Sequence, residues 1–123
     1  MQFGPHLMLD LKGCNPDKLS NLELIFTILS DLPDTIHMHK ITQPYVFPYS
    51  GLVPEDKGIT GFVTIAESHI SIHTFQLKNY AFIDIFSCKD FDYETATHYM
   101  INVFESTEPE VHLVERGIGF PRS

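Results

Sequence analysis

Positive charge is scarce in this chain. Its 123 residues include 8 lysines and arginines against 16 aspartates and glutamates, which gives a formal net charge of −8. A nucleic-acid partner would require a basic face that contacts phosphates, so the charge balance argues against such a partner. The same balance is compatible with a cationic small-molecule substrate.

Cysteines and long apolar segments are also scarce. Cys14 and Cys88 are the only cysteines, and their spacing matches neither a disulfide framework nor a zinc-ligand motif. No apolar run is long enough to span a bilayer, and the first residues lack the basic and apolar regions of a signal peptide. We therefore expect a cytoplasmic protein that makes no membrane contact.

Several familiar functional motifs are missing. The sequence contains no Gly-x-Ser-x-Gly nucleophile motif, no phosphate-binding loop and no dinucleotide fingerprint. His37 and His39 could share a strand face, but two histidines do not complete a zinc-ligand set, so no metal site is expected. There is also no internal repeat or linker, which predicts a single domain over residues 1–123.

Apolar periodicity predicts the secondary structure. Alternation, or enrichment in β-branched and aromatic residues, predicts strands at residues 6–11, 35–41, 59–66, 69–75, 80–87 and 111–115. The spacing of leucines and isoleucines predicts an amphipathic helix that begins after Asn15 and stops at Pro33. A second helix is predicted over residues 91–104, with Asp92 as its cap. Residues 44–57 contain three prolines and are predicted to form a loop.

The order of these elements predicts the fold class. Short connections between the three consecutive strands in the middle of the chain imply antiparallel pairing. The expected fold is α+β, a two-layer sandwich in which helices pack on one face of an antiparallel sheet. The other face would then need a partner, so we expect a homodimer.

The segment Glu67–Thr74 is the most informative part of the sequence. In a strand, Ser71 and His73 lie on one face while Ile70 and Ile72 lie on the other. From residue types alone, this pattern is typical of a half-buried strand with a polar outer face. An acid before a serine, a histidine beyond it and a more distant cysteine are also compatible with several catalytic arrangements.

The chain resembles the bacterial and archaeal S-adenosylmethionine decarboxylases. The resemblance rests on the opening segment 6–14, the helical segment that follows it, the unbroken segment 58–74 and the strand 83–88, which ends in Cys88. It implies a pyruvoyl-dependent carboxy-lyase of polyamine biosynthesis, made as a precursor that cleaves itself between Glu67 and Ser68. Ser68 would thereby become a covalent pyruvoyl group, the cofactor of the enzyme.

The resemblance also implies roles for the residues around this bond. The Ser68 hydroxyl attacks the carbonyl carbon of Glu67 and forms an ester, and His73, helped by the Thr60 hydroxyl, removes the α-proton so that the ester can leave. Thr60 stands where the family usually has serine. The pyruvoyl ketone forms a Schiff base with the α-amino group of a small-molecule substrate, and Cys88 returns a proton after carbon dioxide departs. Cys88 is therefore expected to be accessible rather than inertly buried.

Two family positions that bind the nucleoside differ in this chain. Phe75 replaces a tryptophan, and Leu77 replaces the glutamate that binds the ribose hydroxyls, a loss of roughly 1–3 kcal/mol. The family's adenine-stacking phenylalanine is not evident either. Aromatic residues of the predicted loop, Tyr45, Phe47 or Tyr49, are the available substitutes.

Three functions remain open at this point. The first, which we favour, is an S-adenosylmethionine decarboxylase with a rearranged pocket. The second is a pyruvoyl-dependent decarboxylase of a small basic amino acid, arginine or ornithine, whose side chain would bind to Glu55 and Asp56. The third is a non-processing homologue that serves as a binding or regulatory subunit, and the presence of Ser68, His73 and Cys88 argues against it.

Overall fold

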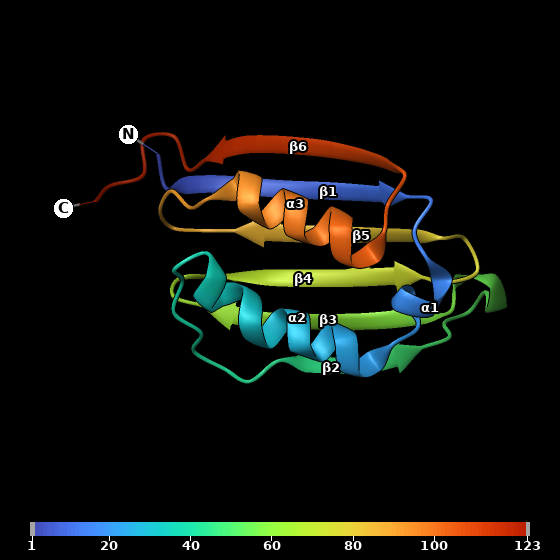
Figure 1. Cartoon of the computed structure of the whole chain (residues 1–123). Helices are drawn as coiled ribbons and strands as arrows, with labels where there is room; N and C mark the ends of the chain where they lie inside the picture. The colour runs from blue at the N-terminus through green and yellow to red at the C-terminus, as the bar shows by residue number, and fades with distance from the viewer. Residues whose placement is uncertain (1, 123) are drawn as a thin grey trace.

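The computed structural model describes residues 2–122, which form a six-stranded antiparallel sheet with helices on one face (Figure 1). The predicted α+β two-layer sandwich is confirmed. The strands are β1 (Gly4–Lys12), β2 (Tyr45–Tyr49), β3 (Gly58–Ile65), β4 (Ser68–Phe75), β5 (Tyr80–Phe86) and β6 (Glu108–Arg116). The helices are α1 (Pro16–Leu19), α2 (Leu22–Thr35) and α3 (Tyr93–Phe104), with a short 3₁₀ helix, η1 (Pro54–Asp56).

The strands are ordered β2-β3-β4-β5-β1-β6 across the sheet. The consecutive strands β3, β4 and β5 pair as neighbours, as their short connections predict, and β1 lies between β5 and β6. Helix α2 packs on β2, β3 and β4, while α3 packs on β1. This arrangement places β4 in the interior of the sheet, with a strand on each side.

The first predicted helix is in fact two helices. The Asn15 side chain caps α1 by accepting a hydrogen bond from the backbone N–H of Asp17 at 2.9 Å. A second cap follows at Asn21, which accepts from the N–H of Leu24 at 3.0 Å and starts α2. The prediction that Pro33 stops the helix is wrong, because α2 continues through this proline to Thr35.

The predicted strand at residues 35–41 is also wrong. These residues end α2 and then turn at His37, which has a left-handed φ of 59°. Only Lys40 pairs with the sheet, through an isolated bridge to Ile65. His37 and His39 therefore do not share a strand face.

The predicted loop at residues 44–57 contains a strand and a 3₁₀ helix instead. Tyr45–Tyr49 forms β2, which pairs with β3 and lies at the edge of the sheet. A proline cannot donate a ladder hydrogen bond, so Pro48 is tolerated at an edge where one side of the strand is unpaired. The segment Pro54–Asp56 forms η1.

One apolar layer fills the space between the helices and the sheet. Alternate residues of the strands point into it and meet the inward residues of α2 and α3. Each fully buried leucine or isoleucine contributes about 1.5–3 kcal/mol. This layer includes Leu7, Leu9, Leu11, Ile25, Leu29, Val63, Ile70, Ile72, Ile83, Ile85, Met100 and Phe104.

The other face of the sheet carries large side chains and, within residues 2–122, no helix. Phe62 of β3 and Phe82 of β5 are 43% and 41% exposed there. We call this the uncovered face. Among the described residues, no helix combines the length and the hydropathy that a membrane crossing requires.

Candidate active site

The predicted cleavage bond lies in the tight turn between β3 and β4. Ala66 and Glu67 form the turn, and Ser68 begins β4 in register with Ile65. Neither turn residue is the glycine or asparagine that two-residue hairpin turns favour. The flanking strands, rather than a local turn signal, therefore predict this hairpin.

The side chain of Ser68 is held without a hydrogen-bonding partner. Its Oγ is buried, and no described residue donates to it or accepts from it. An unsatisfied buried hydroxyl costs about 1–3 kcal/mol, so native structures seldom retain one without a role. Because Ser68 directly follows Glu67, the hydroxyl lies next to the carbonyl group that it would attack.

Cys88 lies at the same turn. The register that pairs His69 with Phe86 continues past the strand ends and brings Cys88 opposite Glu67. The Cys88 Sγ accepts a hydrogen bond from the Glu67 N–H at 3.3 Å and lies 3.6 Å from the Ala66 carbonyl oxygen. The thiol is partly exposed, as its predicted role requires.

Cys14 is the more deeply buried of the two cysteines. It is 3% exposed and belongs to the apolar core. Burial raises the pKa of its thiol to about 11, with a smaller opposing effect from Ser106. Its burial and raised pKa identify Cys14 as a structural residue of low reactivity.

Thr60 and His73 meet on adjacent strands. They are direct partners in the register of β3 and β4, and the Thr60 Oγ1 lies 3.4 Å from the His73 Nδ1. His73 is exposed on the uncovered face. The pairing supports the prediction that the threonine hydroxyl assists the imidazole.

A pocket of about 450 Å³ lies beside this pair. Of the four residues predicted to bind substrate, Phe75 and Asp56 line this pocket, whereas Leu77 and Glu55 do not, and Leu77 is 61% exposed. The Asp56 carboxylate pairs with the Lys78 ammonium, and this hydrogen bond raises the pKa of Lys78. The lining is mainly aromatic and aliphatic and includes Phe47, Tyr49, Leu52, Val53, Asp56, Thr60, His73 and Phe75.

The structure also selects among the aromatic residues that could replace the missing nucleoside contacts. Phe47 and Tyr49 line the pocket, whereas Tyr45 is absent from the lining and stacks on Phe62, with ring centroids 5.7 Å apart. Alternation along β2 does not distinguish the three, because all occupy odd positions of the strand. Phe47 and Tyr49 lie in the lining because the chain segment after β2 folds beside them and forms part of the pocket wall.

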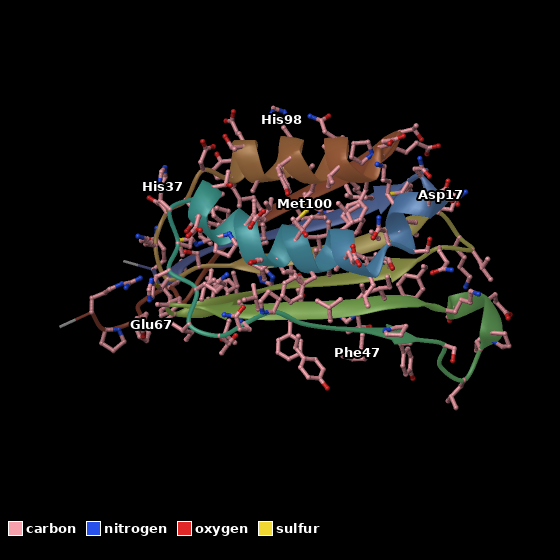
Figure 2. All side chains as sticks on the ribbon, turned by 60° about the horizontal axis from the view of Figure 1, so that its bottom comes forward. Asp17, His37, Phe47, Glu67, His98 and Met100 are labelled. Atoms are coloured by element: carbon pink, nitrogen blue, oxygen red, sulfur yellow. The ribbon has the colours of Figure 1, made fainter. Side chains whose placement is uncertain are left out.

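The two groups of predicted site residues lie at opposite ends of β4. Ser68 begins the strand and His73 follows five residues later, so the two are about 17 Å apart at the rise of an extended chain. In Figure 2 the labelled Glu67 lies toward the end of the sheet that carries the turn, and the labelled Phe47 lies farther along the sheet. One protomer thus joins Glu67, Ser68 and Cys88 at one end, and Thr60, His73 and Phe75 at the other.

The comparisons with known proteins agree with these features. The family model for S-adenosylmethionine decarboxylase matches residues 5–117. The chain belongs to the S-adenosylmethionine decarboxylase family. The predicted family is confirmed, and its members are pyruvoyl-dependent carboxy-lyases.

Individual members of this family cover nearly the whole chain. The S-adenosylmethionine decarboxylase proenzyme of Thermodesulfovibrio yellowstonii is 34% identical over 94% of this chain and 82% of its own length. That of Pyrococcus horikoshii is 31% identical over 94% of this chain and 80% of its own length. The crystal structure of the adenosylmethionine decarboxylase from Aquifex aeolicus superimposes with a TM-score of 0.82 at 29% identity, covering 99% of this chain and 97% of that one.

Beside the cleavage turn, the decarboxylase carries a polar cluster on its uncovered face. The His6 Nε2 lies 3.0 Å from the Asp84 Oδ1, and the Arg116 guanidinium lies 3.3 Å from the His6 Nδ1 and stacks on Phe86. His69 packs against the same phenylalanine. Partial burial lowers the pKa of His69, and the positive potential of His6 and Arg116 adds to this, although Asp84 opposes it.

A second polar group lies on β1 and β6 of the decarboxylase. Potential ligand atoms of Asp10, Glu110 and His112 lie within 4.8 Å of one another. The Lys12 ammonium is 3.7 Å from the Glu110 carboxylate and supplies a positive charge there. No sequence motif indicates this group, because its residues come from opposite ends of the chain.

Proposed function

We propose that this protein is a self-processing S-adenosylmethionine decarboxylase of polyamine biosynthesis whose pyruvoyl cofactor is made from Ser68. The observation that carries this proposal is the turn at residues 66–68. An unpartnered serine hydroxyl, the preceding carbonyl group and a cysteine thiol converge there. Family membership supports the same reaction.

The residues present fit a pyruvoyl group at position 68. A buried hydroxyl that hydrogen-bonds to no described residue loses nothing when processing removes it. The neighbouring Cys88 thiol, partly exposed, provides a proton donor at the same place. When formed, the group supplies an electron sink for the pair released as carbon dioxide departs.

Processing begins with the Ser68 hydroxyl. Its oxygen attacks the carbonyl carbon of Glu67, an ester C–O bond forms, the amide C–N bond breaks, and the nitrogen of residue 68 takes up a proton. His73 then removes the α-proton of residue 68, and the Glu67 carboxylate leaves by elimination. Addition of water and loss of ammonia convert the resulting dehydroalanine into the pyruvoyl group. The products are residues 1–67 and residues 68–123.

This sequence of steps needs a second protomer. Within one chain the backbones of Ser68 and His73 are about 17 Å apart along β4, and residues five apart in a strand point to opposite faces of the sheet. Proton transfer requires a separation near 3 Å, or one bridging water. We infer that His73 and Thr60 of one protomer act on Ser68 of its partner in a homodimer.

The uncovered face provides the surface for that dimer. It presents large aromatic side chains, including Phe62 and Phe82, opposite the face that the helices cover. A two-fold axis that runs between two such faces, perpendicular to β4, reverses the strand direction in the partner. The Ser68 end of each β4 would then lie across from the His73 end of the other. Ser68 shares its strand face with Ile70 and Ile72, so the partner's His73 would approach Ser68 around the end of β4, where the turn begins.

The pocket favours S-adenosylmethionine over a small basic amino acid. Phe47, Tyr49 and Phe75 offer ring faces for an adenine base. Asp56 is the one carboxylate in the lining, and its pairing with Lys78 leaves it poorly suited to bind arginine or ornithine. The relatives named above carry the same substrate in their names.

An intact mass under denaturing conditions tests the cofactor, and an activity panel tests the substrate. We expect two fragments that meet at Glu67 and Ser68, the second lacking a free amino terminus, and release of carbon dioxide from S-adenosylmethionine in preference to arginine and ornithine. Ser68→Ala should remain one chain and be inactive. Wild-type protein that stays uncut after prolonged incubation would contradict the proposal.

A further inference from the structure

The segment that follows β6 returns to the end of the sheet that carries the cleavage turn. Figure 1 shows it in red beside the start of β1. Phe120 packs edge-on against Phe3, with ring centroids 4.9 Å apart, and the Arg122 guanidinium lies 5.2 Å from the Phe3 ring and 5.7 Å from the Phe120 ring. We call residues 117–122 the arm.

Arg122 connects the arm to Cys88. Its Nη2 donates a hydrogen bond to the backbone carbonyl of Cys88 at 2.7 Å and another to the carbonyl of Phe3, and the Gln2 carbonyl oxygen lies 3.4 Å from the same nitrogen. One guanidinium thus joins the arm, the first residues of the chain and the residue that carries the proposed proton donor. Charged donors make the stronger hydrogen bonds to carbonyl oxygens.

Cleavage of the chain would free some contacts of Cys88 and leave others in place. Its thiol contacts the Glu67 N–H and the Ala66 carbonyl, and both belong to the turn that processing opens. After cleavage Glu67 is a free chain end. The hydrogen bond from Arg122 lies outside the turn and survives, as does the bond from the Ser87 N–H to the Pro5 carbonyl, which holds the preceding residue.

We propose that Arg122 is a positioning residue, which holds Cys88 in place for decarboxylation after the chain has been cut. The inference rests on the proposed function. Before cleavage the turn constrains Cys88 as well, so Arg122 contributes little to processing. After cleavage the arm is a main constraint on the Cys88 backbone, so loss of Arg122 slows proton return rather than substrate binding.

The test compares Arg122→Ala and Arg122→Lys with wild type, and uses Lys18→Ala, which removes a cation elsewhere, as the matched control. We expect complete cleavage by intact mass in all four proteins. Arg122→Ala should lower kcat by about 10-fold to 100-fold while KM changes by less than about twofold, because a displaced catalytic group costs rate and not affinity. Arg122→Lys should be intermediate, since lysine keeps the charge but lacks the planar fork of donors.

Alkylation of Cys88 by iodoacetamide provides a readout that does not depend on activity. Cys14 does not interfere, because it is buried and its pKa is raised to about 11. Alkylation of the processed Arg122→Ala protein should be at least about threefold faster than in wild type, because the Cys88 thiol, already partly exposed, is held less firmly without Arg122. Lys18→Ala should react at the rate of the wild type. The uncut Ser68→Ala Arg122→Ala double variant should react at the rate of Ser68→Ala.

Two results would overturn the inference alone: a cut, active wild type whose Arg122→Ala variant keeps its kcat, or an Arg122→Ala variant that loses cleavage and kcat in equal measure. The second result would assign Arg122 to folding. Wild-type protein that stays uncut would overturn the proposed function, and this inference with it.

Discussion

The two ends of β4 differ in what surrounds them. At the first end, Ser68 has a buried hydroxyl without a partner and a cysteine thiol beside the preceding residue. At the other end, His73 is exposed, contacts Thr60 and borders a largely apolar pocket. One end has the bond to be cut and lacks the base, and the other has the base and the pocket and lacks the bond. This difference is the reason for the proposal that each protomer contributes two half sites to a dimer.

Complementation gives the largest expected effect. Ser68→Ala and His73→Ala proteins should each be inactive alone. When they are expressed together, half of the dimers are mixed, and each mixed dimer contains one site with both wild-type residues, so about a quarter of the wild-type activity should return. Cleavage and carbon dioxide release from the co-expressed and separately expressed proteins provide the measurement. Zero activity in the mixture would place both residues in the same chain's site.

His73→Ala alone offers a control for this experiment. The variant can still form the ester, because Ser68 supplies the nucleophile, but it cannot eliminate it. Hydroxylamine should therefore cut the trapped chain, while the Ser68→Ala protein should resist it. If hydroxylamine leaves both variants whole, His73 acts before the ester forms.

A cysteine substitution sharpens the contrast at the Ser68 end. Cys88→Ala should lower kcat by about 10²-fold to 10⁴-fold, the usual contribution of a positioned proton donor, with a smaller change in KM. Steady-state kinetics on fully cleaved protein provide the measurement. Cys14→Ala is the matched control, since it removes the buried thiol and should affect stability rather than turnover. Full turnover in the Cys88 variant would exclude the thiol as the sole donor.

A pocket substitution tests the His73 end. Phe75→Ala should raise KM for S-adenosylmethionine by about 10-fold or more, because stacking on a base contributes about 1–3 kcal/mol. Cleavage should remain complete, since Phe75 neither supplies the nucleophile nor removes the α-proton. Leu77→Ala is the matched control, because Leu77 is 61% exposed and outside the pocket lining. An equal rise in KM for both variants would mean that the dimer brings Leu77 into the site.

The smallest expected effect concerns pH. The lowered pKa of His69 means that the folded chain binds this proton less readily than the unfolded chain. Its contribution to stability is therefore complete above the ordinary value of 6.5 and is lost as the pH falls below that value toward the lowered pKa. In an uncut Ser68→Ala background, His69→Gln should show a smaller fall in melting temperature than its parent between about pH 7.5 and about pH 5.5. An equal or larger fall would contradict this assignment.

The errors of the sequence-based prediction have physical causes. Ile36 and Met38 alternate with two histidines, and both apolar side chains are buried, at 2% and 3% exposure. They lie in the turn that follows α2, however, and not in a strand. Apolar alternation reports burial, and hydrogen bonding to a neighbouring strand is a separate property. The sequence did not predict β2, because the residues of this strand are mostly exposed and include Pro48. By contrast, β1, β3, β4, β5 and α3 combine burial with regular pairing or capping, and their predicted bounds are close to those observed.

The sequence by itself determined the family and, through it, the chemistry expected of this chain. The resemblance to the family predicts that Ser68 attacks, that His73 removes a proton and that Cys88 returns one, and the side chains of these residues are capable of those reactions. Only the tertiary structure decided where those groups stand. The register between β4 and β5 places Cys88 opposite Glu67. The length of β4 separates His73 from Ser68. The contact of Arg122 with Cys88 likewise depends on the path of the chain after β6. Distances of this kind follow from how strands pair and where the chain returns, and neighbouring residues in a sequence do not encode them.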